Sequence, residues 1–406
     1  MEVEAKFKAP NRDAYRELLR VRQLGEYTMT TGSGVVKDWY ETGQLYSERP
    51  LVNGLDHGTS KIFALDGSLL GSTRFYKGKL DGKHEFGTRN TMRIEETFSG
   101  GVRTGKRTVW QFWTMVLEEN YDRRGKFHGP YTAWRNKKTP RFKGDYDHGK
   151  KTGPWVWTDK ENTIEREGTY VDNKRDGVWN EYWEKKLTFT GTYTRGKPDG
   201  TFIYNDRNGH ELGRFEITDG TGTMLTFHGN KKPSSRERLY KGSRDGVYQE
   251  LTTRGKVTLE GHYASNVRHG SWKEWTLDGV LMSEATYKRG KLDGVVKKYV
   301  DGKLSTESTW RDGKAEGPYA ELRDGKPAVT GQFANDRKTG TWTHNDPTGS
   351  VTLVATYVDG VLDGPWKQQL AVGVVLEGTM TAGRRTGTWT RTDKGVVKKI
   401  DYDVTP

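Results

Sequence analysis

The chain contains no cysteine among its 406 residues, so disulfide bonds, thiolate nucleophiles and cysteine-bound metals are excluded. It also lacks any run of about 18 apolar residues, the minimum for a membrane-spanning helix. The opening segment MEVEAKFKAP carries too many charges for a secretory signal peptide. We therefore expect a soluble cytoplasmic protein.

Large aliphatic side chains are scarce as well. Hydrophobic residues make up only 32% of the chain, yet 12% of it is aromatic and 51 residues are glycine. This composition suits neither a thick aliphatic core nor a disordered polar chain. Because each aromatic ring buries about 150–250 Å², rings on a thin sheet can supply most of the buried area.

What the chain does have is a repeat of 22 to 24 residues, seen clearly in YVDNKRDGVWNEYW at 170–183. Each copy contains one glycine at the same place, which we call the marker glycine. A period of this length indicates a solenoid or array. The sixteen marker glycines are Gly34, Gly58, Gly82, Gly105, Gly129, Gly153, Gly177, Gly200, Gly222, Gly246, Gly270, Gly294, Gly317, Gly340, Gly364 and Gly387.

Two further positions recur relative to the marker. Four residues before it, nearly every copy has Gly, Asn or Asp, which tolerate a positive φ and so predict a turn. Thr218 is the exception. Aromatic residues recur seven residues before the marker and two residues after it, as Tyr170 and Trp179 do around Gly177.

These positions predict a hairpin in every repeat. With a four-residue loop, Tyr170 would lie directly across from Trp179. A second turn, such as AspGly at 278–279, closes each unit. The predicted fold is all-β: an elongated single-layer antiparallel β-meander, or solenoid, of about 16 two-strand repeats.

Residues 1–29 do not follow the repeat. A short strand at 3–7 and a helix at about 12–21 predict an N-terminal strand-helix cap for the open sheet edge. In EVEAK, Glu2, Glu4 and Lys6 resemble the ExExK signature that opens the CYTH family of triphosphate-processing enzymes. That resemblance implies metal binding by the two carboxylates and triphosphate contact by the lysine. The barrel strands of that family do not follow, so a cap or a CYTH-like remnant is the alternative.

The repeat array is predicted to span 30–402, with a C-terminal tail at 403–406. Two stretches are irregular. VWQFWTMVLEENY at 109–121 is unusually apolar. At 218–238, Thr218 breaks the turn rule and HGNKKPSSRER interrupts the strand pattern, so we expect a bend there.

The repeats resemble MORN repeats, most closely the variant of the bacterial YwqK-like family. KDWYETGQLYSERPLVNGLDHG at 37–58 and WKEWTLDGVLMSEATYKRGKLDG at 272–294 carry that pattern. The resemblance implies an antiparallel β-ribbon with a binding or scaffolding role. Some of these relatives are labelled antitoxins, and other MORN proteins are membrane-associated or act as scaffolds.

Two surfaces are candidates for binding. The regularly spaced rings either form the interior of a thin sheet or line a groove for a protein partner. This aromatic face comprises Tyr131, Trp155, Trp179, Trp272, Trp342, Trp366 and Trp389.

The second candidate is a basic edge formed by the stacked turns. Aspartates just before the marker glycine offset part of its charge, so a solvated edge is the alternative to a binding surface. The edge comprises Lys79, Lys126, Lys150, Arg175, Lys197, Arg244, Arg268, Lys291 and Arg384.

The net charge of +13 favours an acidic partner. Nucleic acid is disfavoured because no recognised nucleic-acid motif occurs. His57, His128 and His269 share one repeat position and lie too far apart to bind one metal together. We expect no catalytic site, metal or cofactor. The leading hypothesis is a protein-binding surface, with a toxin as one partner class. The alternative is a scaffold that binds anionic lipid.

Overall fold

The computed structural model describes residues 26–30, 32–88 and 90–402. Within these ranges all of the helix and strand elements are β-strands. These residues contain no helix that is long and apolar enough to span a membrane. The chain forms two compact units, Met1–Gly196 and Lys197–Pro406. The predicted helix at 12–21 and the residues Glu2, Glu4 and Lys6 lie outside the described residues, as does the tail at 403–406.

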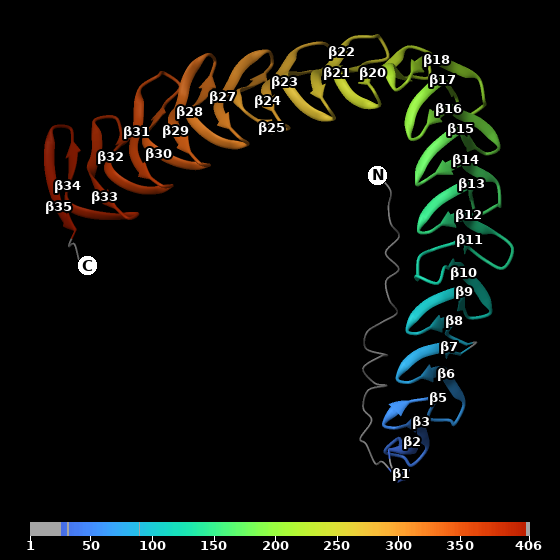
Figure 1. Cartoon of the computed structure of the whole chain (residues 1–406). Coiled ribbons are helices and arrows are strands. Elements are labelled where there is room, and N and C mark those ends of the chain that lie inside the picture. The colour runs from blue at the N-terminus through green and yellow to red at the C-terminus, as the bar shows by residue number, and fades with distance from the viewer. Residues whose placement is uncertain (1–25, 31, 89, 403–406) are drawn as a thin grey trace. The chain divides into compact units, whose positions relative to one another are not determined.

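The first unit contains sixteen strands, shown from blue to green in Figure 1. They are β1 (Glu26–Thr30), β2 (Ser33–Trp39), β3 (Leu45–Val52), β4 (Leu55–Asp56), β5 (Gly58–Phe63), β6 (Leu69–Tyr76), β7 (Lys79–Gly87), β8 (Met92–Ser99), β9 (Val102–Gln111), β10 (Thr114–Tyr121), β11 (Gly129–Trp134), β12 (Pro140–Asp147), β13 (Lys150–Thr158), β14 (Ile164–Val171), β15 (Lys174–Trp183) and β16 (Lys186–Thr194).

The second unit contains the remaining nineteen strands. They are β17 (Lys197–Asn205), β18 (Glu211–Thr218), β19 (Thr221–Phe227), β20 (Pro233–Tyr240), β21 (Ser243–Leu251), β22 (Val257–Ala264), β23 (Val267–Trp275), β24 (Leu281–Lys288), β25 (Lys291–Leu292), β26 (Gly294–Val300), β27 (Lys303–Arg311), β28 (Lys314–Arg323), β29 (Lys326–Ala334), β30 (Arg337–Asn345), β31 (Val351–Val358), β32 (Val361–Ala371), β33 (Val374–Thr381), β34 (Arg384–Asp393) and β35 (Val396–Tyr402).

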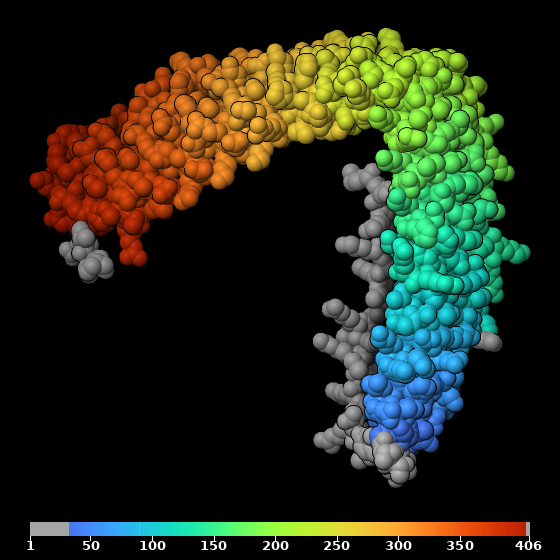
Figure 2. All heavy atoms as spheres, viewed as in Figure 1, coloured from blue at the N-terminus to red at the C-terminus, as the bar shows by residue number. Residues whose placement is uncertain are grey.

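Within each unit the strands form a single-layer antiparallel meander, as the repeats predict. β14 pairs with β13 and β15, for example, and β23 pairs with β22 and β24. Strands contact chiefly their sequence neighbours, so the surface of each unit follows chain order as successive bands of colour (Figure 2). β1 begins at Glu26 and pairs with β2, so the first hairpin already includes residues 26–29, which the sequence assigned to the cap.

The loop before most marker glycines is shorter than predicted, although the loop between β10 and β11 spans 122–128. Between β14 and β15 it consists of Asp172 and Asn173 alone, with φ of 51° and 68°. Two successive residues with positive φ form the type I′ turn that suits the twist of a hairpin. The predicted left-handed position four residues before the marker is therefore confirmed, as the second residue of this loop. We call these two-residue loops the tight turns.

The marker glycine lies inside the second strand and marks a β-bulge. Thr169 pairs with Asp176, whereas the preceding Gly168 pairs with Trp179, so Gly177 and Val178 are extra residues on β15. Gly177 has a φ of 76°, which is costly for any residue with a β-carbon. A bulge that recurs in most repeats explains why glycine recurs there.

The position of the tight turn corrects the predicted register. Tyr170 pairs across β14 and β15 with Arg175, and not with Trp179. The two rings still meet diagonally, with centroids 4.9 Å apart and planes at 80°. The expected direct pairing was wrong because it placed a four-residue loop at 173–176, whereas the chain reverses at Asp172 and Asn173, and the bulge then brings Trp179 opposite Gly168.

The irregularity at Thr218 arises because this hairpin has no bulge. Thr218 pairs with Thr221 around a tight turn of Asp219 and Gly220, and Ile217 pairs directly with Gly222. This hairpin lacks the bulge and is two residues shorter, so its turn residues lie two positions later. The segment predicted to interrupt the strands continues as β20, which pairs with β19 and β21. The bend expected at 218–238 stays a prediction.

The interior of each unit consists mainly of aromatic rings on one face of the sheet. Trp155, Tyr170 and Trp179 form a buried cluster in the first unit. In the second unit Leu376, Met380 and Trp389 do the same. Figure 1 shows that the strands are strongly curved. Curvature lets neighbouring repeats cover a ring that a flat single layer would leave open to solvent.

Candidate functional site

Five of the predicted binding residues are fully enclosed tryptophans. Trp155, Trp179, Trp272, Trp342 and Trp389 are at most 3% exposed. Each indole Nε1–H donates to the backbone carbonyl ten residues earlier, as Trp179 does to Thr169 at 3.1 Å and Trp272 does to His262 at 3.2 Å. The polar atom of each ring is therefore satisfied inside the sheet.

The two other aromatic candidates are half-buried within the same ladder. Tyr131 stacks on Phe142 at 5.9 Å, and Trp366 packs against Trp389 at 5.1 Å. Burial raises the pKa of the Tyr131 hydroxyl. A partner cannot reach the five enclosed rings without opening the sheet, so their present contacts are structural. The binding role predicted for this face stays a prediction.

Each enclosed tryptophan covers a glycine on the neighbouring strand, a position that the sequence reasoning missed. A β-carbon placed on Gly144, Gly168 or Gly261 would lie 2.1 to 2.3 Å from an indole atom. These glycines have no positive φ, so close approach alone requires them. The signal was present in the sequence as a glycine nine residues before many markers.

The basic residue two places before the marker packs between two rings. The guanidinium carbon of Arg268 lies 4.3 Å from the Trp272 ring centroid and 5.5 Å from that of Tyr287. Arg175 lies 4.4 Å from the Trp179 ring and 5.3 Å from the Tyr193 ring. These contacts are cation–π interactions that link successive repeats.

Arg244, another of the predicted edge residues, also lies over a ring, 5.3 Å from the Tyr263 centroid. The basic edge predicted from sequence therefore contains two different groups. Arg175, Arg244 and Arg268 pack against the aromatic ladder. The residues three places before the marker are exposed: Lys126 in the longer loop at 122–128, and beside the tight turns Lys79, Lys150, Lys197, Lys291 and Arg384.

We call the exposed pairs that flank the tight turns the tight-turn edge. Each pair joins the last residue of one strand to the first residue of the next, as in Tyr76–Lys79 and Val171–Lys174. A tight turn bonds to the start of the strand that follows the preceding tight turn, for example from Asn173 N to Lys151 O at 3.0 Å. Within each unit these turns therefore lie side by side along one edge.

Some acidic residues at the same edge accept hydrogen bonds from the backbone of the tight turns. The Asp176 carboxylate accepts a hydrogen bond from the backbone N–H of Arg195, in the next tight turn, at 2.9 Å. Asp245 does the same for Ser265 at 3.2 Å. The aspartates that offset the basic residues thus have a structural role.

Around β8 to β10, ion pairs replace the tryptophan ladder. Arg107 stands two residues after its marker, where other repeats have a ring. Its guanidinium lies 3.1 Å from Glu96 and 2.7 Å from Glu119, both of which are buried. Tyr121 donates to Glu119 at 2.7 Å, and burial together with this bond raises its pKa to about 12. This network pairs its charges internally, as a buried ionic cluster must.

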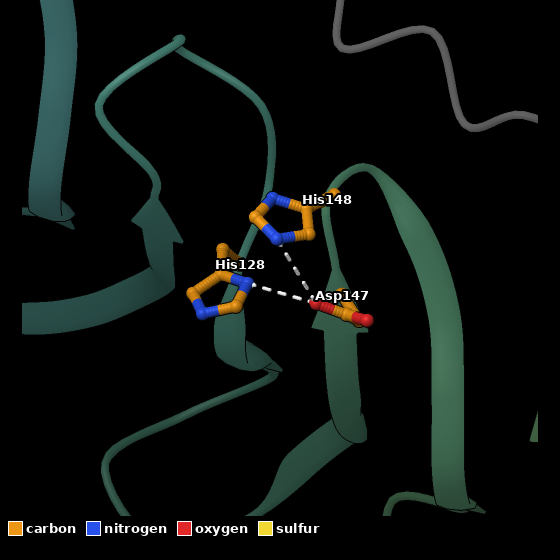
Figure 3. Close-up of side chains that lie close together, drawn as sticks. All are labelled: His128, Asp147 and His148. Atoms are coloured by element: carbon orange, nitrogen blue, oxygen red, sulfur yellow. Dashed lines mark ion pairs between the residues drawn. The ribbon is translucent and has the colours of Figure 1, made fainter.

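One group of titratable side chains is exposed at the tight-turn edge of the first unit. His128, Asp147 and His148 meet there, with the two imidazole rings stacked 4.8 Å apart (Figure 3). His148 also bonds to Asp122 at 2.7 Å, and that bond, with the backbone N–H of Lys126, lowers the pKa of Asp122 to about 2. The sequence argument compared His128 only with its counterparts in other repeats, so it missed His148 on the adjacent turn.

Comparison with known proteins supports the repeat assignment. The family model of the MORN repeat variant matches residues 33–53 and 268–289. No curated protein sequence matches the chain. Among solved structures, BamB from Moraxella catarrhalis aligns over 94% of this chain and 100% of its own, at 10% identity and a TM-score of 0.13. A TM-score this low carries no argument about fold or function.

Proposed function

We propose that this repeat protein is a non-enzymatic binding scaffold that engages an acidic protein partner through its tight-turn edge. The observation that carries the proposal is the row of exposed lysines three places before the marker glycines, beside turns that are hydrogen-bonded to the preceding repeat. Such a row presents positive charge in many of the repeats, though not at Leu55, Val102 or Asp219, and suits an extended acidic surface.

The enclosed rings support this edge from within. Because the five tryptophans are buried and their N–H groups are paired, they hold the sheet in shape instead of offering a groove. Side chains that a partner can reach lie at the turns. Repeat proteins commonly bind through a surface that their stacked repeats hold rigid.

The partner class follows from charge and from the family resemblance. A toxin-like protein with an acidic face, neutralised by contact with the tight-turn edge in the cytoplasm, is the specific form of the proposal. It requires no catalytic residue in this chain.

A membrane surface is the second candidate, and one observation favours it. The tight-turn edge also exposes apolar side chains beside its lysines, among them Val52, Leu55, Tyr76, Val102 and Val171. Basic and apolar groups side by side suit the interface of an anionic bilayer.

The test is retention of the full chain's partners at about 50 mM and about 500 mM salt, run beside vesicles with and without phosphatidylserine. The protein proposal predicts one saturable, acidic protein partner that binds the purified chain directly and weakens with salt. Binding to phosphatidylserine vesicles alone would favour the membrane alternative. Equal binding at both salt concentrations by a variant lacking the exposed lysines would overturn both.

A further inference from the structure

Three potential metal ligands converge in the first unit, between the loop at 122–128 and the tight turn at 148–149. His128 precedes the first residue of β11, Asp147 ends β12, and His148 begins the tight turn that leads into β13. Their ligand atoms all lie within 4.8 Å of one another. Figure 3 shows both imidazole rings beside the Asp147 carboxylate.

The separations are close to those that a metal ion requires. Nδ1 of His128 is 3.2 Å from Oδ1 of Asp147, and Nε2 of His148 is 3.7 Å from the same oxygen. A tetrahedral zinc ion with bonds of about 2.0–2.2 Å places its ligand atoms about 3.3–3.6 Å apart. Because all three side chains are exposed, small rotations can complete this geometry.

A second carboxylate already orients one of the imidazoles. Nδ1 of His148 bonds to Oδ2 of Asp122 at 2.7 Å. Oδ1 of Asp122 is itself fixed by the backbone N–H groups of Arg124 and Lys126, at 2.8 and 2.9 Å. The Asp122 side chain is only 9% exposed. A carboxylate that holds one ring nitrogen and leaves the other facing the ligand cluster is the usual support of a metal-binding histidine.

We propose that His128, Asp147 and His148 bind a divalent transition metal, with zinc as the favoured ion and Asp122 as the residue that positions His148. Two imidazoles and one carboxylate suit zinc, whereas calcium and magnesium prefer oxygen ligands alone. Three protein ligands leave one tetrahedral position open to water or to a side chain of a partner.

Such an ion would connect the loop at 122–128 to the tight turn that follows it. His128 ends this loop and His148 begins the tight turn, so a metal bound to both would cross-link neighbouring repeats. Binding to the folded state alone raises the free energy of unfolding by RT ln(1 + [Zn²⁺]/Kd), where Kd is the dissociation constant for zinc, and so raises the unfolding temperature. Zinc should therefore stabilise the first unit.

The test is calorimetric titration of zinc chloride into the full chain after chelator treatment. The expected result is one zinc per chain and a rise in the unfolding temperature. His128→Ala, Asp147→Ala and His148→Asn should each weaken zinc binding at least tenfold. Asn is chosen because His148 has a φ of 45°, which Asn tolerates. Asp122→Asn should weaken it about 10–100-fold, as loss of an orienting partner does.

His57→Ala is the matched control. His57 occupies the same repeat position as His128 and packs against Tyr76, with ring centroids 5.1 Å apart, but the adjacent tight turn carries Lys77 and Gly78 instead of a histidine. This variant should bind zinc as the natural chain does. Cobalt absorption adds an independent readout, because a tetrahedral site gives strong visible bands. The proposal fails if the natural chain binds no zinc, or if the folded His128→Ala/His148→Asn variant still binds one equivalent.

Discussion

The indole of Trp179 covers Gly168 so closely that a β-carbon on this glycine would lie 2.2 Å from Cδ2 of the ring. The same pairing of a large and a small residue recurs at Gly261 with Trp272, where the distance would be 2.1 Å. The sheet thus stays thin because a glycine on one strand leaves space for the indole ring of the neighbouring strand. This relationship makes the glycine as important as the tryptophan.

Replacing such a glycine should therefore be destabilising even though its backbone is unstrained. Gly261→Ala is expected to cost about 2–3 kcal/mol or more, because the Trp272 ring must shift. Gly229→Ala is the control, since no atom lies within 4 Å of its β-carbon position and its φ is not positive. Urea denaturation should show little change for the control, about 0.5 kcal/mol at most. Equal midpoints for both variants would contradict this account.

The hydrogen bond of the indole N–H should make a separate contribution to the free energy of unfolding. Trp272→Phe keeps a ring but removes the bond to the His262 carbonyl, and should cost about 1–3 kcal/mol. Trp272→Ala should cost about 3–5 kcal/mol, because it also leaves a cavity. Thermal and urea unfolding of both variants would check this order. No loss of stability in the Phe variant would mean that the hydrogen bond contributes nothing.

The sequence was sufficient for the repeat, the strands and the turn chemistry, because each depends on local residue types. Asn173 was predicted to have a positive φ, and it has one. The sequence did not show that the marker Gly177 lies in a bulge, because glycine suits a turn and a bulge alike. Gly177 was therefore taken as the start of a regular strand, and Tyr170 was paired with Trp179 instead of Arg175.

The cation–π contacts of the ladder can be measured in the same way. Arg268→Met removes the charge that lies 4.3 Å from the centroid of the Trp272 ring. It should lower the free energy of unfolding by about 0.5–1 kcal/mol. Lys291→Met is the control, because Lys291 stands three places before its marker, beside the tight turn, whereas Arg268 stands two places before its own. Its unfolding midpoint should stay within experimental error. Similar losses in the two variants would show that net charge, and not ring contact, matters.

Alkaline pH should weaken the fold through its tyrosines. Burial and a 2.6 Å hydrogen bond to Glu321 raise the pKa of Tyr319 to about 12. The ordinary value in an unfolded chain is about 10. Because the folded value is higher, the stabilisation is complete below pH 10 and is lost as the pH rises from 10 to 12.

Absorbance at 295 nm and unfolding temperature, both measured from pH 9 to 12.5, would check this. A class of tyrosines should ionise near pH 12, and the Tyr319→Phe variant should lose one member of that class. Ionisation of every tyrosine near pH 10 in a chain that is still folded would contradict the prediction.

The candidate sites were less predictable than the fold, because they depend on contacts between repeats. Arg268 and Lys291 are both basic and both exposed, and the sequence analysis placed them on one edge, yet Arg268 lies over the Trp272 ring. His128 and His148 occupy different repeat positions, and only the hairpin register brings them together. Contacts between side chains of different repeats could not be read from residue spacing alone.

The central claim is that exposed lysines of the tight-turn edge recognise the partner. A triple variant, Lys79→Glu, Lys174→Glu and Lys291→Glu, reverses the charge at three of them without touching a residue that packs on the ladder. Each of these side chains is exposed.

The matched control reverses three exposed charges at the second turns, with Lys160→Glu, Arg254→Glu and Lys326→Glu. Affinity for the partner is then compared for the natural chain and both variants at one ionic strength. Our account predicts that the tight-turn variant binds at least tenfold more weakly, whereas the control, which has the same net charge, loses much less. Equal weakening of both variants, or none in the tight-turn variant, would contradict it.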